Sequence, residues 1–152
     1  MKFMELSLSY MAPEVLHMKN YTMASDIYSF GIVTYELITG IPPYHKIAYN
    51  SDLALTICQG LRPKIPSNVP PLLTKLIMEC WDAQPDKRPT SKKLFTIINK
   101  WNISSSLFAG FITSKLPSWK LHSEENNTSR LLDTFDLPPS VNLLDFENSL
   151  EN

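Results

Sequence analysis

Few residues in this sequence have the type and spacing to bind a nucleotide or a metal. The two cysteines, Cys58 and Cys80, lack C-x-x-C spacing and are too few for a zinc site or a disulfide framework. We expect two buried, reduced thiols in a cytosolic protein. No two glycines lie close enough together to form a G-x-G-x-x-G loop around a phosphate. The glycines of the chain are Gly31, Gly40, Gly60 and Gly110.

The element that must position any functional residue is a central helix in the first third of the chain. It is predicted to begin near Ser25 or Asp26, either of which can cap it, and to end at Gly40. Its stretch "IYSFGIVTYELIT" has Glu36 as the only charge, and apolar residues fall nearly all round the helix. We therefore predict that this helix is buried on most sides.

Three further helices are predicted from apolar periodicity and capping residues. They cover residues 51–59 with Ser51 as cap, residues 71–81, and residues 91–101 with Thr90 or Ser91 as cap. The middle one carries a predicted buried stripe of Leu72, Leu73, Leu76, Ile77, Cys80 and Trp81, and the last one a stripe of Leu94, Ile97, Ile98 and Trp101. No convincing strand pattern appears in residues 1–102, so the body is predicted to be all-α.

Charge is distributed unevenly along the 152 residues. The net charge is −1, but residues 1–102 hold 11 basic and 8 acidic residues, whereas residues 103–152 hold 3 and 7. A nearly neutral chain gives no reason to expect nucleic acid as a partner. The longest apolar runs are far shorter than the ~20 residues of a membrane span, and the N-terminus lacks the apolar core of a signal peptide. We expect a cytoplasmic protein without membrane contact.

The charge asymmetry suggests two regions, a body over residues 1–102 and a tail over residues 103–152. The tail contains apolar residues without a sustained period and a polar stretch, "HSEENNTSR", which together favour disorder. Two alternatives stay open: a short partner-binding segment, and a strip that packs on the body. The second would use the larger apolar residues of the tail, Leu107, Phe108, Phe111, Ile112 and Trp119.

Three motifs of the body resemble one protein family in order and in spacing. "YMAPEVL" contains the A-P-E sequence that ends the activation segment of protein kinases. "SDIYSFGIVTYELITGIPPY" resembles the kinase F-helix and its following loop, and "CWDAQPDKRPT" resembles the segment between the H- and I-helices. The resemblance covers about residues 5–101 and fits the tyrosine-kinase-like Ser/Thr kinases best. It implies the helical lower C-lobe of the kinase fold, with the F, G, H and I helices and then a mostly irregular acidic tail.

The resemblance implies structural roles for residues of these motifs. Glu14, which follows Ala12 and Pro13 in A-P-E, is implied to form a buried ion pair with Arg88 of "KRPT". This pair would tie the activation segment to the base of the C-lobe. Asp26 is implied to accept backbone N–H groups of the catalytic loop, with a plain helix cap as an equal alternative.

Four more positions follow from the same resemblance. Trp81 is expected to pack as core, and Gly31 is expected to permit a close helix approach. Ser7, three residues before Tyr10, stands where Ser/Thr kinases place the Thr or Ser that faces the catalytic Asp, so both belong to the substrate (P+1) loop. Leu6 departs from the pattern, because the family commonly has glycine there.

The family's ATP and magnesium groups do not occur in this sequence. The three histidines read "HMK", "HKI" and "HSE" where H-R-D is needed, no V-A-I-K lysine exists, and "DFE" at 145–147 lacks the glycine of D-F-G. Phosphoryl transfer depends on positioning and charge neutralisation by those groups. We therefore predict no catalytic residue, no bound ATP or magnesium, and no kinase activity for this chain alone.

Two functions stay open, with a non-functional remnant as a third. The chain is either part of a Ser/Thr-type protein kinase, whose intact relatives phosphorylate proteins in signalling, or a stand-alone module that docks kinase partners through its G- and H-helix surface. Lacking the family's neighbouring segments, the central helix is also expected to leave apolar surface uncovered, which the tail is predicted to cover in part.

Overall fold

The described part of the chain is built from helices alone. The computed structural model describes residues 8–17, 20–102 and 141–142. Its elements are the 3₁₀ turns η1 (Leu8–Tyr10) and η2 (Pro85–Lys87) and the α-helices α1 (Pro13–Leu16), α2 (Met23–Thr39), α3 (Ser51–Cys58), α4 (Pro71–Cys80) and α5 (Ser91–Asn102). This confirms the predicted all-α class. No helix in these residues is both long enough and apolar enough to cross a membrane.

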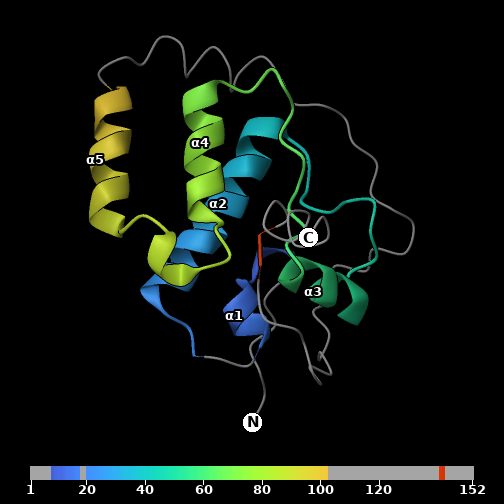
Figure 1. Ribbon diagram of the computed structural model, residues 1–152. Coiled ribbons are helices and arrows are strands. Elements are labelled where there is room, and N and C mark those ends of the chain that lie inside the picture. Colours follow the sequence, from blue (N-terminus) through green and yellow to red (C-terminus); the bar gives the residue numbers. More distant parts are fainter. Residues whose placement is uncertain (1–7, 18–19, 103–140, 143–152) are drawn as a thin grey trace, which may run out of the picture.

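The helices pack around α2. In Figure 1, α4 lies against α2, and α5 lies on the side of α4 that faces away from α2. The helices α1 and α3 lie together in the lower part of the view. One core cluster joins α1, α2 and α4, with Tyr28, Ile32 and Trp81 among its members. A second lies between α1 and α3, and a third between α2, α4 and α5.

The start of α2 differs from the prediction. The N-cap is Thr22, whose hydroxyl accepts from the backbone N–H of Ser25 at 3.2 Å, while the hydroxyl of Ser25 accepts from the N–H of Thr22 at 2.8 Å. This reciprocal capping box satisfies two N–H groups at the helix start. Ser25 and Asp26 therefore lie within the first turn, and the prediction that one of them caps the helix was wrong. Gly40 ends the helix with a left-handed φ of 65°, as predicted.

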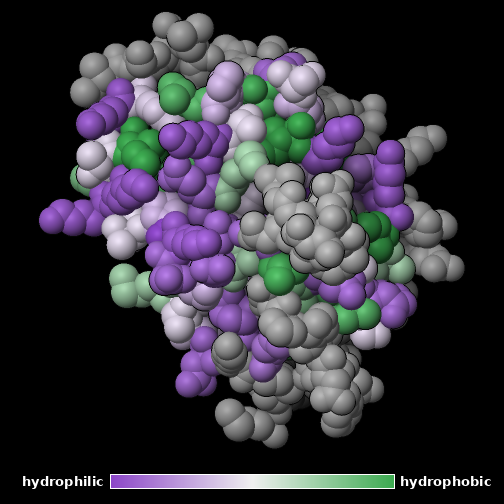
Figure 2. All heavy atoms as spheres, in the orientation of Figure 1, coloured by the Kyte–Doolittle hydropathy of each residue, from purple (hydrophilic) through white to green (hydrophobic). Residues whose placement is uncertain are grey.

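The burial of α2 agrees with its composition except along one edge. Tyr28 and Ile32 are fully buried, but Met23, Val33 and Leu37 are 72%, 42% and 70% exposed. On the face shown in Figure 2, hydrophobic surface alternates with hydrophilic surface and forms no single continuous patch. α2 is therefore buried on most sides, as predicted, and its exposed edge agrees with the expectation that this helix leaves some apolar surface uncovered. The tail residues expected to cover it lie outside the described residues.

The other helices confirm the predicted segments with changes at their caps and edges. Asn50, not Ser51, caps α3, because its side-chain oxygen accepts from the N–H groups of Asp52 and Leu53, both at 3.1 Å. Thr90 accepts from the N–H of Lys93 at the start of α5, as predicted. The two predicted stripes each contain an exposed member, Leu72 at 66% and Ile98 at 41%.

Gly31 marks the closest approach of α2 to α4. A Cβ at this position would lie 2.7 Å from the Cβ of Cys80 and 3.4 Å from the carbonyl oxygen of Ile77. Real Cβ atoms do not come that close, so only glycine allows the two helices to pack at this distance. The predicted role of Gly31 is confirmed.

Candidate functional site

The A-P-E sequence forms a single helical turn that turns Glu14 inward. Ala12 is extended, with φ −68° and ψ 147°, and its carbonyl accepts from the N–H groups of Val15 and Leu16. Pro13 takes the first helical position, where its fixed φ suits the helix and its missing N–H has no partner to lose. Ala12, Pro13 and Glu14 are all buried. The turn therefore presents a carboxylate to the protein interior.

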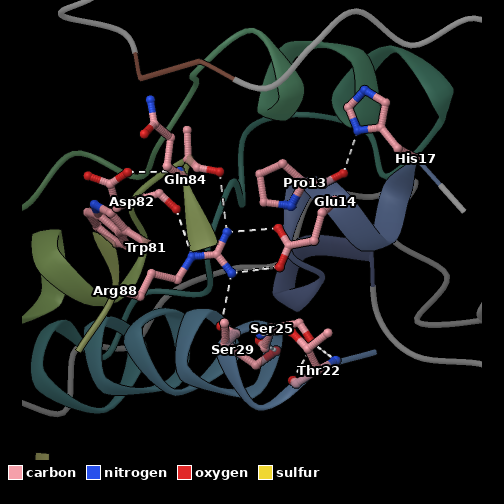
Figure 3. Close-up of polar contacts among 12 residues, drawn as sticks. Pro13, Glu14, His17, Thr22, Ser25, Ser29, Trp81, Asp82, Gln84 and Arg88 are labelled. Atoms are coloured by element: carbon pink, nitrogen blue, oxygen red, sulfur yellow. Dashed lines mark hydrogen bonds and ion pairs between the residues drawn. The ribbon is translucent and has the colours of Figure 1, made fainter. Parts of the chain in front are cut away.

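That carboxylate meets the guanidinium of Arg88. Nη1 of Arg88 donates to Oε1 of Glu14 at 2.7 Å, and Nη2 donates to Oε2 at 2.8 Å, so the pair is bidentate (Figure 3). Glu14 is 8% exposed and Arg88 is 5% exposed. Two parallel charge-assisted hydrogen bonds give this pair a fixed geometry as well as energy. The ion pair implied by the family resemblance is therefore present, and we call it the Glu14–Arg88 anchor.

Arg88 also binds three backbone carbonyls from two other segments. Nη1 donates to Ala24 at the start of α2 at 2.9 Å, Nε donates to Asp82 at 2.8 Å, and Nη2 reaches Ala83 at 3.5 Å. A guanidinium has five N–H donors, and each here has an acceptor. The anchor thus joins α1, α2 and the turn after α4 at one buried point.

Sequence reasoning missed a second arginine in this core. Nε of Arg62 donates to the carbonyl of Trp81 at 3.0 Å, and Nη1 donates to the carbonyls of Ile57 and Leu61 at 2.9 and 2.7 Å. The guanidinium carbons of Arg62 and Arg88 both lie 5.2 Å from the ring centroid of Tyr28, within cation–π distance. Arg62 shares the proline-punctuated stretch "QGLRPKIP" with Lys64, and nothing in that stretch marks Arg62 as the positioned cation of the two.

Tyr28 supplies the aromatic surface between these two cations. It is fully buried, and burial raises the pKa of its hydroxyl above the ordinary value despite the two arginines. The ring is therefore neutral at physiological pH and serves as a packing platform. Its burial agrees with the prediction for this helix, but its two cationic neighbours could not be inferred from the sequence.

Tyr10, which is predicted to belong to the substrate loop, ties the segment before α1 to α2. Its hydroxyl donates a short hydrogen bond to the carboxylate of Glu36, and its carbonyl accepts from the hydroxyl of Ser29 at 2.7 Å. Burial, and then the bond to Glu36, raises the pKa of Tyr10 well above its usual range. Tyr10 is therefore a fixed, protonated donor. Ser7, the other predicted substrate-loop residue, lies outside the described residues.

Trp81 is buried in the core, whereas Asp26 lies on the exposed surface. Trp81 is 5% exposed, and its ring centroid lies 6.1 Å from that of Tyr35 at a tilt of 48°, so its expected core role is confirmed. Asp26 is exposed on the first turn of α2, and its carboxylate makes no hydrogen bond within the described part of the chain. Its implied contact with a catalytic loop stays a prediction.

The described residues form a buried polar junction without a metal-ligand cluster. No three His, Cys, Asp or Glu side chains in residues 8–17, 20–102 and 141–142 come together as metal ligands. Both cysteines are free and buried, and burial raises the pKa of Cys58 to about 11 and of Cys80 to about 12. Neither thiol is a nucleophile at neutral pH. The "DFE" sequence at 145–147 lies outside the described residues.

Known proteins match the same part of the chain. The model of the family described as protein tyrosine and serine/threonine kinase matches residues 2–98. A probable serine/threonine-protein kinase of Dictyostelium discoideum is 37% identical over 94 residues, which are 62% of this chain and 7% of that protein. The serine/threonine-protein kinase STY17 of Arabidopsis thaliana is 37% identical over 91 residues, which are 60% of this chain and 16% of that protein. The chain therefore spans only a small part of these curated relatives.

Proposed function

Because the chain belongs to the protein tyrosine and serine/threonine kinase family, we propose that it forms the substrate-loop end and helical base of a Ser/Thr protein kinase C-lobe. In this role its residues hold a loop in position and do no chemistry themselves. Tyr10 and Ser7 belong to the loop that receives the protein substrate. The catalytic Asp, the phosphate-binding loop and the magnesium ligands would have to come from residues that this sequence does not contain.

The observation that carries the proposal is the Glu14–Arg88 anchor. It fixes the end of the A-P-E turn to the carbonyls of Ala24 and Asp82, which belong to α2 and to the turn after α4. Tyr10 adds a second tie, since its hydroxyl binds Glu36 in the last turn of α2. A loop held at both points can present a substrate hydroxyl in one geometry, which is the main contribution of a protein to phosphoryl transfer.

A chimeric kinase tests this role directly. Residues 8–101 would replace the matching segment of the Arabidopsis relative, and phosphorylation of a protein substrate would be measured. We expect the chimera to keep activity, and the same chimera with Arg88→Ala to lose at least about tenfold in kcat/KM, because the loop loses its support. Glu79→Gln, a change on the exposed side of α4, is the matched control. A folded but inactive wild-type chimera would contradict the proposal.

We further propose that this chain alone binds neither ATP nor magnesium and transfers no phosphate. The support is the sequence, which lacks the Gly-rich loop, H-R-D and D-F-G motifs. Thermal unfolding of the purified chain would be followed while ATP and magnesium are titrated. We expect no shift in Tm at any concentration, since only a ligand that binds the folded state raises it. A saturable rise in Tm would overturn this part of the proposal.

A docking module is the second candidate function, and one surface feature favours it. A shallow hollow of about 440 Å³ lies between the start of α4 and the loop before it. Its lining includes Ile65, Val69 and Met78, and Leu72 is exposed on the same helix. Cross-linking in cells would test this candidate: a partner that depends on the hollow should be lost with Met78→Glu and kept with Lys92→Glu. Equal recovery with both variants would exclude the hollow as the docking surface.

A further inference from the structure

A short segment far along the chain is hydrogen-bonded to the helical body. The N–H of Val141 donates to the carbonyl of Cys58 at 3.0 Å. The side-chain oxygen of Asn142 accepts from the N–H of Ala83 at 2.9 Å, and its Nδ2 donates to Oδ1 of Asp82 at 3.2 Å. In Figure 1 the red segment, residues 141–142, lies beside α3. Both residues are partly buried.

The body offers this segment two backbone groups that need partners. Cys58 ends α3, and the last carbonyls of a helix have no partner within the helix. In the described part of the chain only the Val141 N–H donates to this carbonyl. Ala83 is 4% exposed, and Asn142 is the described acceptor for its N–H. Buried backbone groups are rarely left unpaired, so this acceptor and this donor form a site ready for a polar ligand.

The carboxylate of Asp82 completes the site and selects the ligand. Its Oδ1 accepts from the N–H of Gln84 at 2.8 Å as well as from Asn142, so its position is fixed by its own turn. A ligand side chain here must accept from Ala83 and donate to Asp82 at the same time. Asparagine does both with one carboxamide. An aspartate in the ligand would instead face the Asp82 carboxylate and be repelled.

We propose that the Cys58 carbonyl, the Ala83 N–H and the Asp82 carboxylate form a docking site for an extended peptide that carries an N–H followed by an asparagine, and that residues 141–142 are its occupant in this chain. The occupied site lies next to the Glu14–Arg88 anchor, because the carbonyls of Asp82 and Ala83 both accept from Arg88. Docking thus braces the turn that holds Arg88 on one side and α3 on the other. A partner with the same two groups would compete with residues 141–142 for the site.

Amide hydrogen exchange in the full chain tests the site. We expect the N–H of Ala83 to exchange slowly in the wild type and about fivefold to tenfold faster in Asn142→Ala, as for the loss of one buried hydrogen bond. Asn68→Ala, at an exposed loop position, is the matched control and should leave Ala83 unchanged. Asn142→Asp should accelerate exchange as much as Asn142→Ala. Adding Asp82→Asn should restore slow exchange, because the new carboxamide can donate to the new carboxylate.

A second experiment, in which a peptide is added, tests the site even if a variant is globally destabilised. The probe is a synthetic peptide of residues 137–146, "LPPSVNLLDF", titrated onto the Asn142→Ala chain. We expect it to slow exchange at Ala83 again, and expect the same peptide with Asn replaced by Asp to have no effect. The amide of Ile77 inside α4 reports global opening. Equal Ala83 exchange in wild type and Asn142→Ala, or equal effects of the two peptides, would overturn the proposal.

Discussion

Two sets of ion pairs in this molecule use the same kinds of side chain in opposite surroundings. Arg88 and Glu14 meet at 2.7 Å, with side chains that are 0% and 10% exposed. On the outer side of α4, Glu79 lies 4.0 Å from Lys75 and 3.5 Å from Lys93, and the two lysine side chains are 76% and 59% exposed. We call these three residues the outer cluster.

The difference shows that surroundings, not charge, decide the structural weight of an ion pair. Water and salt screen the outer cluster, and such pairs contribute about 0–1 kcal/mol. Both members of the anchor are removed from water, so the Glu14 carboxylate depends on Arg88 for its hydrogen bonds. Breaking the anchor leaves a buried charge without a partner, which costs about 3–5 kcal/mol. We therefore expect the anchor to contribute far more than the outer cluster to holding α1 in place, beside the apolar packing of Val15 and Leu16.

The largest expected effect comes from breaking the anchor. Arg88→Ala should lower the free energy of unfolding by about 3–5 kcal/mol, because the Glu14 carboxylate stays buried and unpaired. Urea unfolding of the purified variant measures this change. Glu79→Gln is the matched control and should change it by less than about 1 kcal/mol. Similar losses for the two variants would abolish the distinction between the buried and the exposed pairs.

Replacing both anchor residues sharpens the same contrast. Glu14→Leu combined with Arg88→Met removes both charges together, so no uncompensated charge stays inside. We expect the double variant to be more stable than Arg88→Ala alone, as for buried pairs exchanged for apolar residues. If the double variant loses as much unfolding free energy as Glu14→Leu and Arg88→Met do when their losses are added, the two side chains act independently.

The next effect concerns the contact between Gly31 of α2 and Cys80, which follows Glu79 and lies on the buried side of α4. Alanine forms helices better than glycine by about 1 kcal/mol, so local propensity alone predicts that Gly31→Ala stabilises the protein. The new Cβ would lie 2.7 Å from the Cβ of Cys80, however, and the two helices would have to separate. We expect a net loss of about 1–3 kcal/mol in the free energy of unfolding. A higher Tm for Gly31→Ala would mean that α2 and α4 do not approach so closely.

Alkaline pH should lower the free energy of unfolding through Cys80, on the buried side of α4. Burial raises the pKa of Cys80 from 9.0 to about 12, so above pH 9 the unfolded state loses its thiol proton first. This contribution to stability is fully present below pH 9 and is lost as pH rises towards 12. Urea unfolding between pH 8 and pH 10.5 should show stability falling with pH, and falling less steeply in Cys80→Ala. Parallel pH curves for the two proteins would contradict a buried, protonated thiol.

The smallest effect is the response of the outer cluster to salt. The Debye length falls to about 3 Å in 1 M salt, which screens exposed pairs at 3.5–4.0 Å. The difference in unfolding free energy between wild type and Glu79→Gln should therefore shrink towards zero in 1 M NaCl. The difference between wild type and Arg88→Ala should persist there. If salt reduced both differences equally, the anchor would have to be exposed to water, contrary to the structure.

The sequence predicted the two residues of the anchor but not the groups that surround them. Glu14 and Arg88 stand in two motifs whose order and spacing match one family, so their pairing could be expected. The prediction that Ser25 or Asp26 caps α2 was wrong, because the helix begins at Met23, Thr22 is its N-cap, and Ser25 completes the capping box from the first turn. Arg62 and Asn142 escaped notice because each bonds a backbone group of a distant segment, Trp81 and Ala83 respectively, and no local pattern marks such partners.

By itself, the sequence determined the all-α class, the four longer helices, the family and the absence of the family's ATP-binding motifs from these 152 residues. These follow from periodicity, punctuation by glycine and proline, and motif order, which are properties of neighbouring residues. Only the tertiary structure decided which side of α2 stays exposed, that Arg88 also holds Ala24 and Asp82, and that Val141 and Asn142 dock beside α3. Burial and long-range hydrogen bonds depend on where the chain returns in space, and a linear pattern does not contain that information.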